Sequence, residues 1–117
     1  MPLALAEVRQ LAQATLDVPP LQKYFHIDQL PERKPLVVAL NKVLEADPGL
    51  TKFGSPVVFV PAAEVGRRPH VEFTRLERDG SGAVVELRYA VEGIRCKVRF
   101  EKDGEAWKVE STELAER

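Results

Sequence analysis

One pair of side chains in this sequence has types and spacing that could support proton transfer. His26 and Asp28 lie two residues apart in an aromatic segment, and an imidazole beside a carboxylate can act as a general base. Tyr89 is the further residue that such an enzyme would use. We interpret the pair instead as an anchor that holds its segment by hydrogen bonds, because spacing alone does not supply catalytic geometry. No complete catalytic, metal-binding or phosphate-binding motif occurs in the sequence.

The cysteine and histidine positions do not point to redox or metal chemistry. Cys96 is the single cysteine, so no internal disulfide can form. It alternates in phase with Val98 and Phe100, which predicts a buried and inert thiol rather than a nucleophile. Neither His26 nor His70 has a cysteine or carboxylate at a recognised zinc-ligand spacing. We therefore predict no metal and no cofactor.

Residues 70–113, which include Tyr89 and Cys96, have the pattern of β-strands. Apolar residues recur there at every second position, which places them on one face of a sheet. Glycine-containing turn sequences at 79–82, 92–93 and 103–104 separate the runs, which predicts a four-stranded antiparallel meander. Leu76 falls out of phase with Phe73, so we expect a β-bulge or the end of strand pairing within residues 75–78.

The pattern of the N-terminal sequence predicts a helix followed by an irregular segment. Residues 3–16 carry an apolar stripe at helical spacing, which needs the apolar face of the meander as its partner surface. Pro19 and Pro20 should forbid further helix, because proline lacks the backbone donor. Residues 21–35 are rich in aromatic side chains but have no sustained period. We expect a packed loop or a single helical turn that lies across the open end of the sheet as a lid.

The middle of the chain is partly ambiguous. Residues 36–46 fit a helix, a strand, or a short strand that runs into a helix. Residues 57–60 predict a fully buried strand that joins the sheet of the meander, and residues 62–65 predict one helical turn. The expected fold is α+β, with an N-terminal helix or helices packed on a bent antiparallel β-sheet that ends in the meander. A single domain should span residues 1–117.

The charge of the chain is balanced, which restricts the classes of partner. Lysine and arginine number 17 against 18 acidic residues, so the formal net charge is −1. No overall basic field is present to hold nucleic acid or an anionic membrane. No stretch is apolar for long enough to span a bilayer. We expect a cytoplasmic protein that binds neither nucleic acid nor membrane.

The C-terminal hairpin resembles that of a known superfamily. An Asp103-Gly104 turn followed by Trp107-Lys108-Val109, after the strand that ends at residues 89–93, is similar to the last hairpin of nuclear transport factor two-like (cystatin-like cone) domains. The resemblance covers residues 3–114 in outline. It implies either an isomerase-like or cyclase-like enzyme with a pocket inside the cone, or a non-catalytic binding protein. Immunity proteins that neutralise a bacterial toxin belong to the second kind, and a homodimer through the exposed sheet is a further implication.

The two faces of the predicted sheet favour binding over catalysis. The inward face offers Tyr89, Cys96, Trp107 and Ser111 but no carboxylate that burial could activate. The enzyme or ligand-carrier alternative predicts a pocket lined by Tyr24, His26, Tyr89 and Trp107. The polar face alternates basic and acidic residues, which either pair across strands or form a recognition surface for another protein. The predicted partner-binding residues are Arg67, Arg68, Arg88, Lys97, Arg99 and Lys108.

Overall fold

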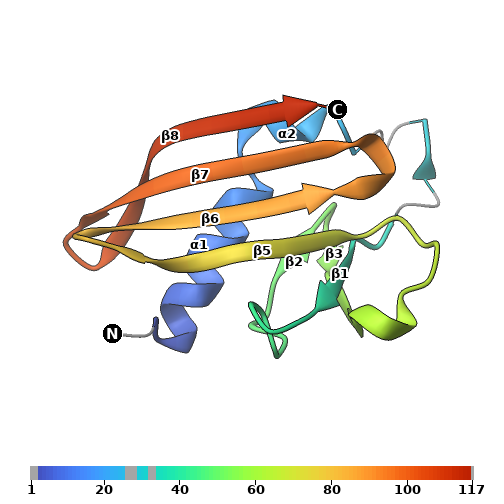
Figure 1. Ribbon diagram of the computed structural model, residues 1–117, viewed down its shortest axis with the longest axis horizontal. Helices are drawn as coiled ribbons and strands as arrows, with labels where there is room; N and C mark the ends of the chain where they lie inside the picture. Colours follow the sequence, from blue (N-terminus) through green and yellow to red (C-terminus); the bar gives the residue numbers. More distant parts are fainter. Residues whose placement is uncertain (1–2, 26–28, 32–33, 117) are drawn as a thin grey trace.

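The chain forms a layer of helix packed against a layer of sheet. The computed structural model describes residues 3–25, 29–31 and 34–116. A six-stranded sheet has the order β4-β1-β5-β6-β7-β8, and β2 and β3 form a separate two-stranded sheet (Figure 1). The predicted α+β class is therefore confirmed. The elements are α1 (Leu5–Leu16), α2 (Pro19–Gln22), β1 (Val37–Leu40), β2 (Thr51–Lys52), β3 (Ser55–Pro56), β4 (Val58–Pro61), β5 (Val71–Asp79), β6 (Gly82–Tyr89), β7 (Ile94–Asp103) and β8 (Ala106–Glu116), with 3-10 turns η2 (Ala62–Glu64) and η3 (Ala90–Glu92).

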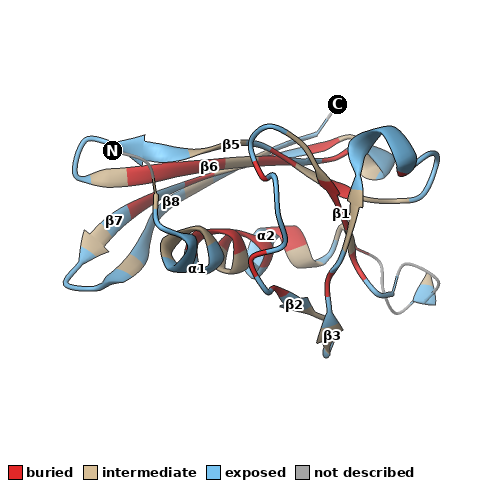
Figure 2. Cartoon of the chain, turned by 90° about the horizontal axis from the view of Figure 1, so that it is seen from below, coloured by how far each residue is buried: buried red, intermediate tan, exposed pale blue. Residues whose placement is uncertain are grey.

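Helix α1 covers one face of the sheet. It lies within the predicted residues 3–16, and its side chains at Leu11, Ala12 and Leu16 have no exposed surface. Figure 2 shows this buried stripe facing the strands of the meander, β5 to β8. Leu5 is 67 % exposed, so the first residue of the predicted apolar stripe lies outside the core. The helix therefore docks mainly through its C-terminal half.

The segment after α1 departs from the prediction, because Pro19 and Pro20 start the short helix α2 instead of excluding helix. They occupy its first two positions, where a backbone N–H has no partner within the helix, so the missing donor costs little there. Beyond α2, Phe25 is 1 % exposed and packs against the rings of Phe53 and Tyr89, with centroids 5.3 Å apart in both cases. This aromatic segment therefore forms part of the core at the Tyr89 end of the sheet.

The predicted four-stranded antiparallel meander is confirmed as β5 to β8. Its first bulge lies between Phe73 and Arg75, immediately before the residues where we predicted one. A second bulge lies in β8, where Arg99 pairs with Ser111 but Phe100 pairs with Val109. The extra residue reverses the alternation of side chains beyond it. Ser111 consequently points away from α1, which corrects its predicted inward position.

Strands β1 and β4 make the sheet mixed, so the prediction of a wholly antiparallel sheet is correct only for the meander. β1 pairs in parallel with both β4 and β5. Of the alternatives for residues 36–46, only the strand forms, and Asn41 ends it by accepting hydrogen bonds at Oδ1 from the backbone N–H groups of Val43 and Leu44. β4 joins the sheet at its edge with Val58 38 % exposed, so it is not fully buried as predicted. The helical turn predicted at residues 62–65 is present as η2.

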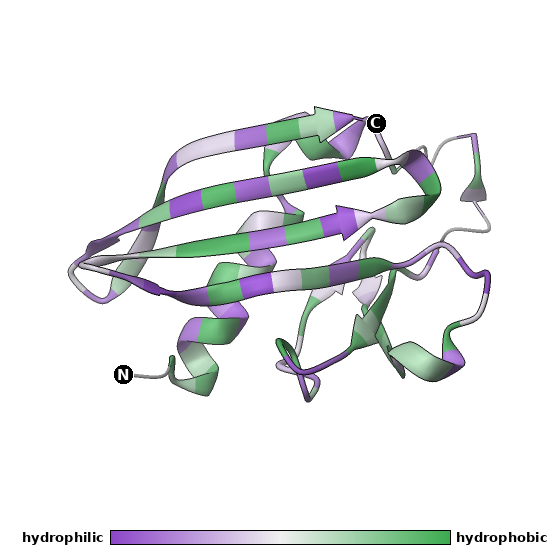
Figure 3. Cartoon of the chain, in the orientation of Figure 1, coloured by the Kyte–Doolittle hydropathy of each residue, from purple (hydrophilic) through white to green (hydrophobic). Residues whose placement is uncertain are grey.

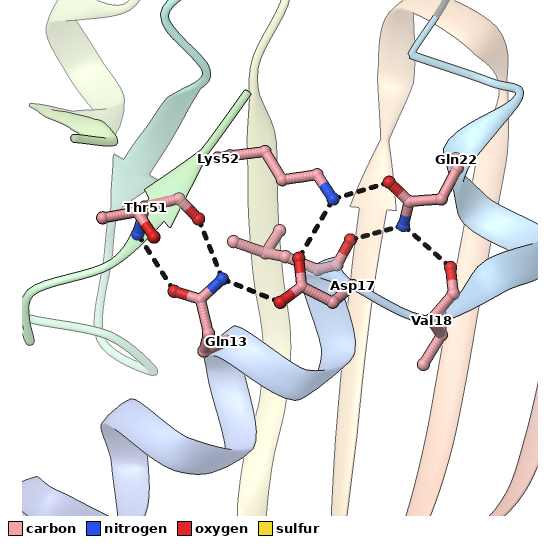
Figure 4. A network of polar contacts seen from close by, with 7 residues as sticks. Gln13, Asp17, Val18, Gln22, Thr51 and Lys52 are labelled. Atoms are coloured by element: carbon pink, nitrogen blue, oxygen red, sulfur yellow. Dashed lines mark hydrogen bonds and ion pairs between the residues drawn. The ribbon is translucent and has the colours of Figure 1, made fainter. Parts of the chain in front are cut away.

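The β2–β3 hairpin is tied to both helices by polar contacts (Figure 4). Gln13 Nε2 donates to the carbonyl of Thr51 at 2.8 Å, and the backbone N–H of Thr51 donates to Gln13 Oε1 at 2.9 Å. Lys52 Nζ contacts Asp17 Oδ1 at 3.0 Å and Gln22 Oε1 at 2.5 Å, while its side chain is only 9 % exposed. These contacts hold the hairpin against the aromatic end of the core.

The two glycines of the β5–β6 turn have different roles, which predicts different costs of substitution. A Cβ on Gly82 would lie 2.3 Å from the carbonyl oxygen of Phe100 on the neighbouring strand, whereas a Cβ on Gly80 would meet no atom within 4 Å. Gly80→Ala should lower the free energy of unfolding by about 1 kcal/mol, because φ is +62° there. Gly82→Ala should lower it by about 2–3 kcal/mol, because the strands must separate. Urea denaturation measures both, and equal losses would contradict this difference.

Candidate functional site

The face of the meander that points away from α1, which we call the outer face, is polar. Figure 2 shows α1 and α2 on the opposite side of these strands. Hydropathy alternates along much of the meander (Figure 3), because successive side chains point to opposite faces. The register aligns the outer-face side chains into rows that cross all four strands. Two adjacent rows are Glu72-Arg88-Arg95-Ala115 and Arg75-Glu86-Lys97-Glu113.

A depression of about 620 Å³ lies over these two rows, and we call it the outer cleft. This volume is within the range of ~300–1,000 Å³ that is common for binding sites. The short side chains of Thr74 and Ala115 leave space between their longer neighbours. Four cationic and two anionic side chains contribute to the lining, which consists of Thr74, Arg75, Glu86, Leu87, Arg88, Arg95, Cys96, Lys97, Glu113, Leu114 and Ala115.

Arg88 is neutralised by an acidic neighbour on β5. Its Nε and Nη2 atoms lie 2.9 and 2.7 Å from Glu72 Oε1. Burial acts to raise the pKa of Glu72, but the hydrogen bonds from Arg88 and Asn41, together with the charges of Arg88 and His70, hold that pKa below its usual value. Glu72 is therefore ionised at neutral pH and keeps the Arg88 side chain directed toward β5.

Arg75 and Arg99 also have acidic partners on the outer face. Arg75 Nε donates to Glu77 Oε1 at 2.6 Å, and Arg75 Nη1 lies 3.8 Å from Glu86 Oε2. Arg99 Nη1 lies 2.8 Å from Asp79 Oδ2. Pairs this exposed contribute little to stability. Their main effect is to neutralise the charges of Arg75 and Arg99 and to fix the orientation of both side chains.

Arg95 and Lys97 differ from these cations, because neither forms an ion pair with any residue that the structure describes. Lys97 has acidic residues directly opposite on both neighbouring strands, Glu86 and Glu113. Arg95 has none, since it lies opposite Arg88 on β6 and Ala115 on β8. Positive charge is therefore uncompensated at the Arg95 end of the outer cleft.

The structure groups only some of the predicted partner-binding residues. Arg88 and Lys97 line the outer cleft, and Arg99 lies on the same face in the next row. Lys108 also lies on this face, but at the far end of β8, opposite Glu101. Arg67 and Arg68 are exposed in the loop between η2 and β5 and are not part of the lining. The predicted set therefore divides between the cleft, the distal outer face and this loop.

Two cations of the outer cleft were missed by sequence reasoning. Arg95 shares its alternation with Lys97 and Arg99, and this shared phase was the signal that could have identified it. Arg75 gave no such signal, because the bulge after Phe73 moves it onto the outer face out of phase with the strand before it. Whether these two residues lie in the outer cleft depends on how the strands are paired. That pairing cannot be read from the local sequence.

Of the described residues predicted to line an internal pocket, Trp107 lies apart from Tyr24 and Tyr89, which share the other end of the sheet. Tyr89 is 1 % exposed and packs in the core, whereas the Tyr24 hydroxyl donates to Glu116, which raises the pKa of Tyr24. Trp107 lies at the opposite end of the sheet, about 26 Å from Tyr89 along the strands, with its ring 4.5 Å from Lys102 Nζ. Buried side chains fill the space between α1 and the meander. His26, of the pocket-lining set, and Asp28 lie outside the described residues.

Cys96 should be chemically inert in the folded protein. Burial raises the pKa of its thiol to about 11, and the side chain is 1 % exposed. At about pH 8 roughly one thiol in a thousand is therefore ionised, and the reactive species is the thiolate. A disulfide reagent such as dithionitrobenzoate should react at once in denaturant but only at the rate of global unfolding in buffer. Rapid labelling of the folded protein would show that Cys96 is accessible.

Neither the described residues nor comparison with known proteins adds a further indication of function. No cluster of three or more histidine, cysteine, aspartate or glutamate side chains that could hold a metal ion is found within residues 3–25, 29–31 and 34–116. Over the same residues, no helix is long and apolar enough to cross a membrane. No protein-family model, curated protein or solved structure matches this chain. The case for a function therefore comes from the geometry of the outer face.

Proposed function

We propose that this protein is a non-catalytic module that binds another protein through the outer face of its meander. The observation that carries the proposal is the outer cleft, a depression of about 620 Å³ whose lining includes four cationic and two anionic side chains. The helices pack on the other face of the sheet, so this surface is open to a partner. Arg95 and Lys97, the cations without an ion-pair partner among the described residues, are the central contacts of the proposed interface.

The pattern of charge favours a protein as the partner. Nucleic acid is held mainly by cations that neutralise successive phosphates, but here acidic side chains alternate with basic ones along the row Arg75-Glu86-Lys97-Glu113. A protein surface can match both signs of charge, and such complementarity increases specificity and association rate. The partner should therefore present acidic groups toward Arg95 and a mixed surface toward the neighbouring row.

A toxin-neutralising role is one specific form of this proposal. It is supported by the resemblance of the C-terminal hairpin to nuclear transport factor two-like domains, some of which are immunity proteins. Under this form the partner is a bacterial toxin, and binding blocks its action. Expression of the captured partner alone should then arrest cell growth, and coexpression with this chain should restore it. Growth arrest that persists on coexpression would exclude this form while leaving the binding function in place.

Comparative affinity capture tests the proposed function. The tagged protein is used to capture partners from its native lysate, and the bound proteins are quantified by mass spectrometry. A specific partner should be retained by the wild type and lost by the double variant Arg95→Glu and Lys97→Glu. The matched double variant Arg9→Glu and Lys42→Glu changes the net charge equally, but at exposed positions outside the outer cleft. A partner retained equally by all three proteins would overturn the assignment of the interface.

A further inference from the structure

Arg88 and Arg95 form an unusual cross-strand pair in the outer cleft. They lie directly opposite each other on β6 and β7, on the same face of the sheet. Like charges directly opposite each other destabilise a sheet, whereas opposite charges stabilise it. The next residue in the row, Ala115, is neutral and short, so the edge strand β8 supplies no acidic group to offset Arg95. Glu72 offsets the charge of Arg88, whereas the charge of Arg95 is not offset by a residue directly opposite it on either neighbouring strand.

Both arginines border two adjoining hollows of the outer face. One is the outer cleft, and the other is a smaller depression of about 100 Å³, which Arg88 and Arg95 line together with Ala90, Gly93 and Ile94. The arginine pair thus forms the boundary between the two depressions. A group bound at this boundary would lie beside both residues.

The contacts of Arg88 leave donors available for such a group. Its Nε and Nη2 atoms contact Glu72, whereas its Nη1 atom makes no hydrogen bond within the described part of the chain. All the guanidinium nitrogens of Arg95 lack an ion-pair partner there. Guanidinium groups bind carboxylates through short, charge-assisted hydrogen bonds. Donors from two opposed side chains are therefore available for one anion.

We propose that Arg88 and Arg95 form an anion site that receives one carboxylate from an acidic segment of the partner protein. This proposal rests on the proposed function and names the chemistry that the interface recognises. A carboxylate bound there would offset the charge of Arg95, which has no acidic residue opposite it on either neighbouring strand. The segment enters from the edge of the sheet, where Ala115 leaves the path to Arg95 open.

The surrounding charges favour a carboxylate over a phosphate. Of the four cations in the outer cleft, Arg75 and Arg88 contact acidic side chains and Lys97 faces two of them. Only Arg95 has no acidic residue directly opposite it on a neighbouring strand, so a single negative charge completes the balance. A doubly charged phosphate would also be repelled by Glu86 and Glu113, which line the same cleft.

Titration with small anions, monitored by nuclear magnetic resonance, tests this site without the partner. The probes are a short capped glycine peptide with one aspartate, the same peptide with asparagine, and inorganic phosphate. The aspartate peptide should shift the Nε–Hε resonances of Arg88 and Arg95 saturably at millimolar concentration, and the asparagine peptide should not. Arg95→Ala should abolish the saturable shift. Arg99→Ala, on the same face but outside the lining, should leave it unchanged.

Several results would overturn the anion site. Tighter binding of phosphate than of the aspartate peptide would exclude the carboxylate assignment. Equal, non-saturating shifts of every arginine would show screening by salt instead of a site. In thermal denaturation, Arg95→Thr should leave the melting temperature nearly unchanged, because Arg95 forms no ion pair with the described part of the chain. A marked decrease would show a structural role for Arg95.

The two proposals can fail separately. If the small probes do not bind but a captured partner still depends on the outer face, the anion site is wrong and the binding function stands. If the probes bind at Arg95 but the captured partners bind the double variant Arg95→Glu and Lys97→Glu as well as the wild type, the proposed interface is wrong. Loss of both signals in the variants, with both present in the wild type, supports the full account.

Discussion

Replacing Phe25 with alanine should lower the free energy of unfolding by about 3–5 kcal/mol. The Phe25 ring is 1 % exposed and contacts the rings of Phe53 and Tyr89, each with centroids 5.3 Å apart. Its removal leaves a cavity at the point where the residues after α2, the β2–β3 hairpin and the meander meet. A domain of this size is usually stable by only ~5–15 kcal/mol. Urea denaturation followed by tryptophan fluorescence measures the loss.

Phe25→Leu provides the control for this substitution. Leucine retains much of the apolar volume, so the loss should be clearly smaller, about 1–2 kcal/mol. If Phe25→Ala cost less than about 1 kcal/mol, the ring would not be part of the core, and the placement of the residues after α2 would be wrong. Equal losses for leucine and alanine would mean that the aromatic edge contacts, rather than buried volume, dominate.

Reversing the charge of both Arg95 and Lys97 should weaken partner binding by at least ~100-fold, which corresponds to about 2.7 kcal/mol. Each reversal removes an attraction and adds a repulsion toward acidic groups of the partner. Neither residue forms an ion pair with the described part of the chain, so their substitution breaks no salt bridge there. Calorimetry with the purified partner measures the change in affinity, and circular dichroism checks that the variant is folded.

Two comparisons separate this effect from a general effect of charge. The variant Arg9→Glu and Lys42→Glu should bind within about threefold of the wild type, because distant exposed charges are screened at physiological salt. The affinity of the wild type should also fall as salt is raised, and the double variant at Arg95 and Lys97 should show a weaker dependence on salt. A similar loss in both double variants would point to long-range attraction without a defined interface.

The meander could be predicted from local sequence alone. The alternation of apolar residues and the Asp79-Gly80 and Asp103-Gly104 turns both act over a few residues, so they are visible without tertiary structure. Helix α1 was predictable for the same reason. The parallel pairing of β1 with β4 and β5 was not, because it joins segments separated by long connections and depends on packing.

The outer cleft could be predicted only in part. Alternation placed Lys97 and Arg88 on the polar face, but it could not show that Arg88 opposes Arg95 or that Ala115 follows Arg95 in the row. Those neighbours depend on strand register, and the bulges in β5 and β8 alter the register at single residues. An unpartnered cation is therefore a property of the folded sheet and not of the local sequence.

The most direct test of the proposed interface is site-specific photo-crosslinking to the captured partner. A photoreactive amino acid is introduced at Thr74 or Ala115, which line the outer cleft, or at Gln10, which is exposed on α1. We expect a crosslinked product of chain plus partner from both cleft positions and none from the α1 position. Crosslinking from Gln10 with none from Thr74 or Ala115 would contradict the proposed interface, because the partner would then bind the helical side of the protein.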